Sequence, residues 1–278
     1  MNRRPVQALV AALLLPSSAL AQWLGPQPEL DTPYVPTPQA VVEKMLDLAQ
    51  VKPGDTIIDL GSGDGRVVIT AARERGARGF GVEIDPQLVN VSNENARRAG
   101  VADRAKFLKQ DLFDTDLHKA DVLTLYLLPD VNTKLRPKIL AELAPGARVV
   151  SHDYDMGDWK PDAEETVPAP DKSVGARKES VLYLWIVPAK VEGDWTLEVG
   201  GRRVPLRLAQ RYQSVSGTAG GAAISHGRLR GDELRMTLPA GVVGGEPLEL
   251  VGRVAGDSMS GSARRGEREV ESWSARRR

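Results

Sequence analysis

Residues 57–66 read Ile57-Ile58-Asp59-Leu60-Gly61-Ser62-Gly63-Asp64-Gly65-Arg66, which places a glycine-rich turn directly between an apolar strand and a helix. Glycine lets the backbone approach a bound molecule closely, and the N-terminus of the following helix offers unpaired N–H groups. A glycine-rich turn alone is weak evidence for a binding site. Here the strand before it and the helix after it supply the context that a nucleotide-type binding site requires. The segment therefore predicts the start of a Rossmann-like sheet.

Three acidic residues near this turn distinguish between the cofactors it can hold. Dinucleotide sites favour G-x-G-x-x-G with a pyrophosphate on the helix, whereas here the loop is G-S-G-D-G and follows Asp59. A carboxylate there would repel pyrophosphate but can organise the loop around a cationic methionine ammonium. Glu83 stands where a ribose diol would be held, and Asp111 follows the third strand, where an adenine amino group would lie. Each acid alone has an ordinary explanation, as a turn residue, surface charge or helix cap, but together they predict an S-adenosylmethionine site.

The chain around this turn alternates short apolar runs with helical stretches. The predicted strands are 56–60, 78–84, 105–109, 122–127 and 147–152, and the predicted helices are 65–75, 87–99 and 131–143. One more amphipathic helix begins near Pro38 and ends before Pro53, and residues 181–187 suit an antiparallel strand at the edge of the sheet. This alternation predicts an α/β fold with a Rossmann-like parallel sheet and right-handed crossovers.

After residue 188 the pattern becomes that of a small all-β domain. Glycine becomes frequent, helical periodicity disappears, and short alternating runs take its place. GRLRGDEL (227–234) resembles GRVAGDSM (252–259), and since Gly-Asp pairs between strands are turn signals, we expect two similar hairpins. Trp195 and Trp273 are interpreted as core residues rather than a carbohydrate platform. No acid pair, metal cluster or nucleophile triad stands out, so this module is expected to dock a partner.

The N-terminus has the pattern of a secretory signal peptide. Arg3 and Arg4 precede the mainly apolar residues 6–15, and Ala19-Leu20-Ala21 is a small-x-small cleavage site. We expect cleavage after residue 21, no membrane span afterwards, and export to the periplasm; the alternative is a membrane anchor through residues 5–21.

Composition narrows the classes of partner. Lys plus Arg and Asp plus Glu are equal at 37 each, so no overall charge draws the chain to nucleic acid. The chain has no cysteine, which excludes disulfides, thiolate metal sites and cysteine nucleophiles. We therefore predict neither a nucleic-acid partner nor a metal.

The sequence resembles the class I methyltransferase superfamily, and more narrowly the lysine methyltransferases related to the enzyme that modifies the c subunit of mitochondrial ATP synthase. The resemblance covers about residues 32–188. It is carried by Pro33-Tyr34-Val35-Pro36-Thr37-Pro38, by DLGSGDGRVVI (59–69), by Gly81-Val82-Glu83-Ile84-Asp85-Pro86 and by Gly146-Ala147-Arg148-Val149-Val150-Ser151. It implies S-adenosylmethionine-dependent N-methylation of a protein lysine. The alternatives are a small-molecule methyltransferase and an exported binding protein that keeps the fold without catalysis.

The resemblance also assigns site residues. The arm around Tyr34 and Thr37 would fold over the cofactor, and the glycine turn would face its methionine portion. The full expected cofactor-binding set is Tyr34, Thr37, Asp59, Gly61, Ser62, Gly63, Glu83, Ile84, Asp111, Leu112 and Leu128. The resulting domain organisation is a signal peptide (1–21), an extended proline-rich arm (22–38), a methyltransferase domain (39–188) and an all-β module of unknown role (189–278).

The methyl acceptor is expected beside Tyr126-Leu127-Leu128-Pro129-Asp130, after the fourth strand. By the resemblance, the lack of an Asn/Asp-Pro-Pro-Tyr signature disfavours bases and glutamine as acceptors. A lysine acceptor must lose a proton, and Asp130 and His152 are the candidate bases. Their ordinary alternatives are a helix N-cap and a strand-end histidine. Tyr154 and Trp159 either line the acceptor entrance or pack in the core.

Overall fold

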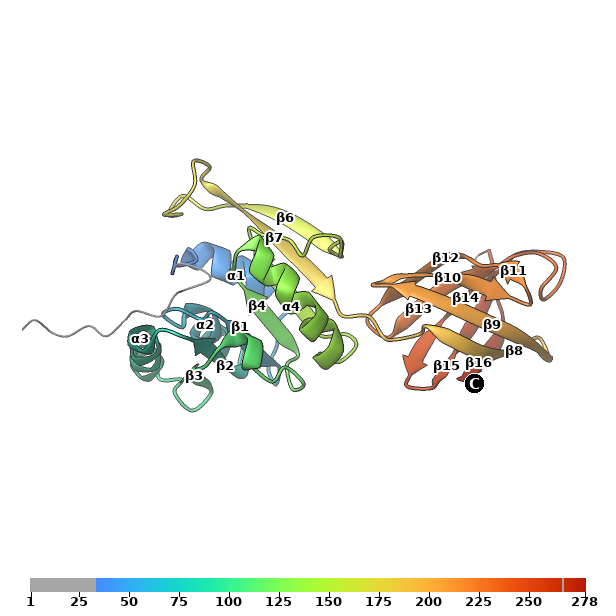
Figure 1. Cartoon of the computed structure of the whole chain (residues 1–278), viewed down its shortest axis with the longest axis horizontal. Coiled ribbons are helices and arrows are strands. Elements are labelled where there is room, and N and C mark those ends of the chain that lie inside the picture. The colour runs from blue at the N-terminus through green and yellow to red at the C-terminus, as the bar shows by residue number, and fades with distance from the viewer. Residues whose placement is uncertain (1–33, 267) are drawn as a thin grey trace, which may run out of the picture.

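The chain forms two sheets, one mixed and one antiparallel, and helices pack on the first (Figure 1). The computed structural model describes residues 34–266 and 268–278. The predicted signal peptide and residues 22–33 of the predicted arm lie outside the described residues. Among the helices that the structure describes, none has the length and apolar character needed to cross a bilayer.

The first sheet has the predicted parallel core. Its seven strands follow the order β3-β2-β1-β4-β5-β7-β6, in which the first five are parallel and β7 is antiparallel to both of its neighbours. The strands are β1 (Thr56–Leu60), β2 (Arg78–Glu83), β3 (Ala105–Lys109), β4 (Val122–Leu125), β5 (Arg148–His152), β6 (Ala163–Pro168) and β7 (Glu179–Ile186). The order reverses between β1 and β4, so the carboxyl ends of these two strands flank a ligand-binding crevice.

The prediction of an edge position for the last strand was wrong. The strand over 181–187 exists as β7 and is antiparallel, but β6 lies outside it and forms the edge. Residues 163–168 read Ala-Glu-Glu-Thr-Val-Pro, and only Val167 among them is buried. An edge strand with so little apolar alternation carries no periodic signal that a sequence pattern could detect.

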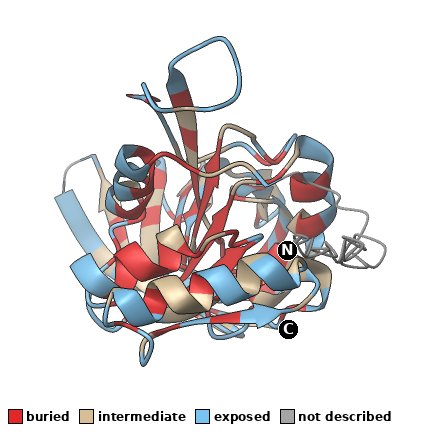
Figure 2. Ribbon diagram, turned by 90° about the vertical axis from the view of Figure 1, so that its left-hand side faces the viewer, coloured by how far each residue is buried: buried red, intermediate tan, exposed pale blue. Residues whose placement is uncertain are grey.

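Helices cover both faces of this sheet. They are α1 (Gln39–Leu48), α2 (Arg66–Glu74), α3 (Pro86–Arg98) and α4 (Pro129–Glu142), with a short 3₁₀ helix, η1 (Leu112–Asp114). Buried residues of α1, α2 and α3 belong to one apolar cluster, and those of α4 belong to another on the opposite face. Figure 2 shows that the helices turn buried residues inward and exposed residues outward. This is the amphipathic pattern from which the helices were predicted.

The second sheet closes into a β-barrel. Its ring is β9-β10-β12-β13-β14-β15-β16-β8, closed by pairing of β10 with β9, and β11 adds to β10. The strands are β8 (Gly193–Val199), β9 (Arg202–Arg211), β10 (Ser214–Ala219), β11 (Ala222–Ala223), β12 (Ser225–Arg230), β13 (Glu233–Leu238), β14 (Leu248–Ala255), β15 (Ser258–Arg265) and β16 (Arg268–Arg277). The expected hairpins are confirmed as β12–β13 and β14–β15. Trp195 and Trp273 are buried in the barrel core, as expected.

The barrel contacts the α/β domain through the loop between β5 and β6. Trp159 in this loop is fully buried, and its ring lies between Trp185 of β7 and Tyr212 of the barrel, with centroids 5.8 and 5.9 Å away. Asp158 accepts hydrogen bonds from Arg136 of α4 and from Arg211 and Tyr212 of the barrel. Trp159 is therefore a packing residue, which confirms the core role that was one of the two predicted for it.

We expect Trp159→Ala to lower the free energy of unfolding by about 3 to 5 kcal/mol, because a buried aromatic ring shared by two domains would leave a cavity. Urea unfolding followed by tryptophan fluorescence and circular dichroism measures this loss. Trp159→Phe is the matched control: it keeps an aromatic ring and removes an indole N–H that has no partner in the structure. Equal stabilities of Trp159→Ala and the unmodified chain would contradict this account of the junction.

Candidate functional site

A cavity at the carboxyl ends of β1, β2 and β4 brings together residues from distant parts of the chain. Most come from the arm, the glycine turn, the end of β2, the start of η1 and the segment after β4, and Met45 of α1, Val67 of α2 and Leu88 of α3 also line it. Its predicted lining residues are Tyr34, Thr37, Asp59, Gly61, Ser62, Gly63, Glu83, Ile84, Asp111 and Leu112. Leu128, the remaining predicted residue, does not line the cavity. It is the N-cap of α4 and packs against the core under that helix, whereas Leu127 faces the cavity.

The backbone conformation of the glycine turn is one that residues with side chains rarely adopt. Gly61, Gly63 and Gly65 have φ values of +76°, +53° and +84°, in the left-handed region. A Cβ atom on Gly63 would lie 2.5 Å from Cε2 of Tyr34, and one on Gly61 would lie 3.0 Å from Cδ2 of Leu127. The turn therefore provides an open backbone surface, and Tyr34 of the arm lies directly against it.

Glu83 connects the end of β2 to this turn. Its Oε2 accepts a hydrogen bond from the Gly63 amide at 3.0 Å, and its Oε1 accepts from the amides of Ile84 and Asp85 at 2.8 and 3.1 Å. A carboxylate oxygen has more than one acceptor position, so the same group can also accept from a diol in the cavity. Sequence analysis predicted a ligand contact here but not the hydrogen bond to the turn.

Asp59 is buried at the bottom of the cavity. Thr124 Oγ1 of β4 donates to its Oδ1 at 2.6 Å. Burial raises the pKa of Asp59 to about 7, the hydrogen bond from Thr124 lowers it in part, and the negative charges of Glu83 and Asp64 raise it further. At neutral pH this carboxyl group is therefore close to its titration midpoint, and a cation in the cavity would favour its ionised form.

Two hydrogen bonds fasten the arm over the cavity. Arg66 Nη1 donates to the Thr37 carbonyl at 2.7 Å, and Arg66 itself pairs with Asp64 at 2.6 Å. The hydroxyl of Thr37 lies 3.2 Å from Nδ1 of His152 on β5. Arg66 and Asp64 line the cavity but were not predicted as site residues. Arg66 binds a backbone carbonyl of the arm, and a sequence pattern does not show which side chain binds a backbone group so far away in the chain.

The structure places neither candidate base in the cavity. His152 is fully buried, and its two ring nitrogens contact Thr37 and the Ser180 hydroxyl, the latter at 2.7 Å. Burial lowers the pKa of His152 to about 4, with nearby Lys172 also lowering it and Asp153 opposing. Asp130 is exposed in the first turn of α4, which begins at Pro129, so it is not the predicted N-cap either. His152 therefore contacts the arm through Thr37 and does not line the cavity.

Asp111 is the helix cap that was considered as its ordinary role, and it also lies in the cavity. Its side chain lines the cavity, and its Oδ1 also accepts from the Phe113 amide at 2.8 Å, which caps η1. Tyr126 and Leu127, which belong to the segment predicted to lie beside the methyl acceptor, also line the cavity. The lining residues at this end and beside β4 that were not predicted are Val82, Leu88, Gln110, Phe113 and Leu125.

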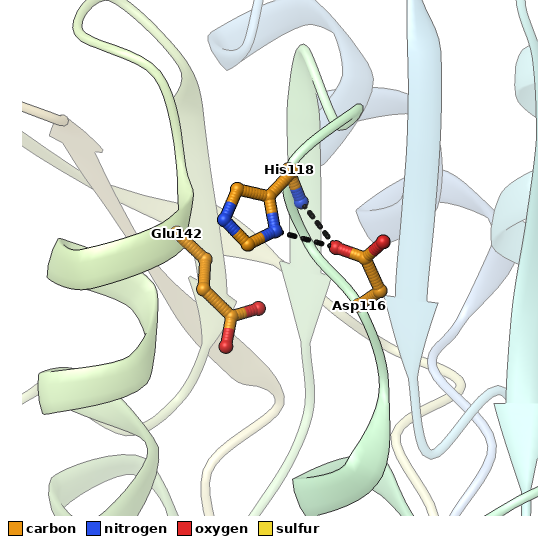
Figure 3. A group of neighbouring side chains, drawn as sticks. All are labelled: Asp116, His118 and Glu142. Carbon is orange, nitrogen blue, oxygen red and sulfur yellow. Dashed lines mark hydrogen bonds and ion pairs between the residues drawn. The ribbon is translucent and has the colours of Figure 1, made fainter.

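Asp116, His118 and Glu142 form a separate group of potential metal ligands (Figure 3). They lie before β4 and at the end of α4, at the amino ends of the parallel strands and opposite the cavity. Glu142 already accepts from Lys138 Nζ at 2.7 Å and from the Leu117 amide. With a cation already paired to one of its three members, this group is interpreted as a surface hydrogen-bond cluster.

Comparison with known proteins gives consistent matches for the α/β domain. Residues 59–163 match the family described as the ANTKMT methyltransferase domain. A protein-lysine N-methyltransferase of Saccharolobus islandicus is 39% identical over 156 residues, covering 56% of this chain and 93% of that protein. The adenine nucleotide translocase lysine N-methyltransferase of Mus musculus is 38% identical over 133 residues, covering 48% of this chain and 57% of that protein. The chain thus spans little more than half of the mouse relative.

A solved structure is also similar to this chain. It is described as an RNA methyltransferase from Salinibacter ruber in complex with S-adenosyl-L-homocysteine, with 52% sequence identity and a TM-score of 0.51. The match covers 56% of this chain and 96% of that one. The residues matched by the family, 59–163, end before the barrel begins at Gly193.

We expect Asp59→Asn to change how stability depends on pH. Because the folded-state pKa of Asp59 lies near 7, above its unfolded value near 4, the folded state holds this proton more tightly. The group stabilises the fold below pH 4, and that contribution is lost as pH rises toward 7. The unfolding free energy of Asp59→Asn relative to the unmodified chain should therefore increase by up to about 4 kcal/mol between pH 4 and 7. A pH-independent difference in urea titrations would contradict this.

Proposed function

The chain belongs to the ANTKMT methyltransferase family, and from that premise we propose that it transfers a methyl group from S-adenosylmethionine to a lysine amine of a protein. The observation that carries the proposal is the cavity at the switch between β1 and β4, where the glycine turn, Asp59 and Glu83 converge. Relatives named as protein-lysine N-methyltransferases support lysine as the acceptor.

The residues of the cavity fit S-adenosylmethionine. A Cβ atom on Gly61 or Gly63 would crowd Leu127 or Tyr34 in the lining of the cavity, so the backbone of the turn can face a ligand only without side chains there, and the hydroxyl of Ser62 is buried without a partner. Asp59 suits the methionine ammonium, because a nearby cation stabilises its charged form. Glu83 would accept from the ribose hydroxyls, and Asp111 with Leu112 would lie along the adenine. These assignments agree with the positions of the residues along the edge of the sheet from β1 to β3.

Catalysis at this site is proposed to depend on positioning. When bound, the cofactor would supply an activated methyl group on a sulfonium. A neutral acceptor amine would attack that methyl carbon in line, so that the N–C bond forms as the S–C bond breaks, with S-adenosylhomocysteine as the leaving group and a methylated ammonium as the product. The arm, held by Arg66 and His152, covers the cavity and excludes water from it. Since neither His152 nor Asp130 reaches the cavity, no step is assigned to a base among these two residues. The acceptor amine approaches beside Tyr126, after β4.

The predicted export of the chain stays a prediction. If residues 1–21 are a cleaved signal peptide, the acceptor is a protein outside the cytoplasm; if residues 5–21 are an anchor, it lies at a membrane surface. We propose the first arrangement, with the barrel docking the acceptor protein or another partner. Fractionation of cells that express the chain with and without residues 1–21 tests the location.

The proposed activity is tested by labelling a cell lysate with methyl-labelled S-adenosylmethionine. We expect the chain to transfer label to protein, and acid hydrolysis to release it as methylated lysine. Gly63→Arg should abolish transfer, because its side chain would meet the Tyr34 ring in the cavity. Gly100→Arg is the matched control, since Gly100 also has positive φ but no atom lies near its Cβ position. Label that disappears on nuclease treatment would instead identify an RNA acceptor and contradict the proposal.

Glu83→Ala should weaken S-adenosylmethionine binding by about 1 to 3 kcal/mol, because a ribose contact is lost and the Gly63 amide loses its acceptor. Isothermal titration calorimetry measures this change. Glu94→Ala, on the exposed side of α3 and away from the cavity, controls for the lost negative charge and should bind normally. Unchanged affinity in Glu83→Ala would remove this residue from the binding site.

A further inference from the structure

Asp153 lies directly behind the cavity wall on the side of the expected acceptor. Its Oδ2 accepts from the Tyr126 hydroxyl at 3.3 Å, and its Oδ1 accepts from the Val181 amide of β7 at 3.1 Å. Tyr126 lines the cavity, whereas Asp153 does not. Asp153 is therefore one hydrogen bond away from the place where the methyl acceptor must arrive.

The backbone of Asp153 is held in an unusual conformation. Its φ is +63°, in the left-handed region, which a residue with a side chain adopts at a free-energy cost. The contacts to β4 and β7 hold it there and aim its carboxylate toward Tyr126. Residues held in this way occur preferentially at binding sites.

The Asp153 carboxylate already forms an ion pair with a lysine ammonium of this chain. Lys172, in the loop between β6 and β7, places its Nζ 2.7 Å from Asp153 Oδ2 and 2.8 Å from the Glu179 carbonyl. The Lys172 side chain is only 11% exposed. A nearly buried lysine ammonium thus lies next to the tyrosine that borders the methyl-transfer cavity.

Aromatic and acidic side chains surround this position. The ring of Tyr154 stacks on Tyr126 with centroids 6.4 Å apart. The pKa of Tyr183 is raised by burial and by the nearby negative charges of Glu164, Asp155 and Asp153. Tyrosine rings and carboxylates together favour a cation, and a lysine side chain matches both its charge and its apolar stem.

The orientation expected for the bound cofactor also supports an acceptor site near Asp153. If Glu83 holds the ribose at the end of β2 and Asp111 lies along the adenine after β3, the methyl end faces β4. Tyr126 directly follows β4, and the Asp153 carboxylate is the negative group bonded to it. An incoming lysine that contacts Asp153 would therefore approach the cavity from its reactive end.

We propose that Asp153 and Tyr126 form the capture site for the acceptor lysine ammonium, and that Lys172 fills it until an acceptor replaces it. This deepens the proposed lysine methyltransfer and rests on it. Asp153 binds the acceptor beside Tyr126, behind the cavity wall, and does not act as the base, because it does not line the cavity. The β6–β7 loop thus competes with the substrate for one carboxylate.

The test is calorimetric binding of the synthetic peptide decalysine to the full chain at low ionic strength, with and without S-adenosylhomocysteine. Lys172→Met should tighten binding at least fivefold, because it frees the carboxylate. Lys106→Met controls for the same change of charge at an exposed position of β3 and should bind like the unmodified chain. Asp153→Asn should weaken binding at least fivefold, and asparagine tolerates the left-handed backbone there. Glu198→Gln, on the barrel, controls for that loss of charge.

The outcomes separate capture from a structural role. A lysine that only stabilises its loop would lower the melting temperature when replaced but would not tighten decalysine binding, so unchanged or weaker binding by Lys172→Met overturns the proposal. Equal effects of Lys106→Met and Lys172→Met also overturn it, because binding would then follow total charge. Should Asp153→Asn fail to fold, Lys172→Met still decides. The titration measures binding and needs no methyl transfer. If the titration gives the expected result but lysate labelling fails, the proposed methyltransferase activity is rejected and the proposed capture site is not.

Discussion

The hydrogen bond from the Gly63 amide to Glu83 is the contact on which the arrangement of the site depends. It joins the left-handed turn after β1 to the end of β2, and thereby fixes the open backbone opposite the acid that faces the same cavity. The arm extends this arrangement, because Tyr34 lies against Gly63 and Arg66 of α2 binds the Thr37 carbonyl. A change at Gly63 would therefore disturb the turn, the acid and the arm together.

Local signals explain what could be predicted from the sequence. The strand, the glycine turn and the acids at strand ends follow from short-range pattern, and they located the parallel sheet and the glycines and acids of its cavity. The other predicted lining residues, including Tyr34 and Thr37 of the arm, came from the family resemblance. Leu128 was misplaced because one residue of shift after β4 reverses which side chain faces the cavity. β6 was missed because it is a polar edge strand. The partners of Arg66 and His152 depend on segments 29 and 115 residues apart, which no local pattern reports.

The loop between β5 and β6 links the two parts of the molecule. It starts beside the proposed capture site at Asp153 and ends in contacts with the barrel through Asp158 and Asp162. Asn132 of α4 is fully buried and donates to the carbonyls of Tyr154 and Asp155. The barrel is thereby fastened to the loop that begins at the proposed capture site rather than to the residues that line the cavity.

Closure of the barrel has a consequence for how it could evolve. Within residues 193–266 and 268–277, each strand of the ring has a partner on both sides, so most of its main-chain groups are used in the ladder. A protein that binds by adding a strand would find only short unpaired stretches on that ring. The ring instead presents outward side chains, such as the exposed Arg203, Arg207 and Arg235. Those positions can change one at a time without disturbing the barrel core, so the outer surface of the barrel can vary while the α/β domain stays the same.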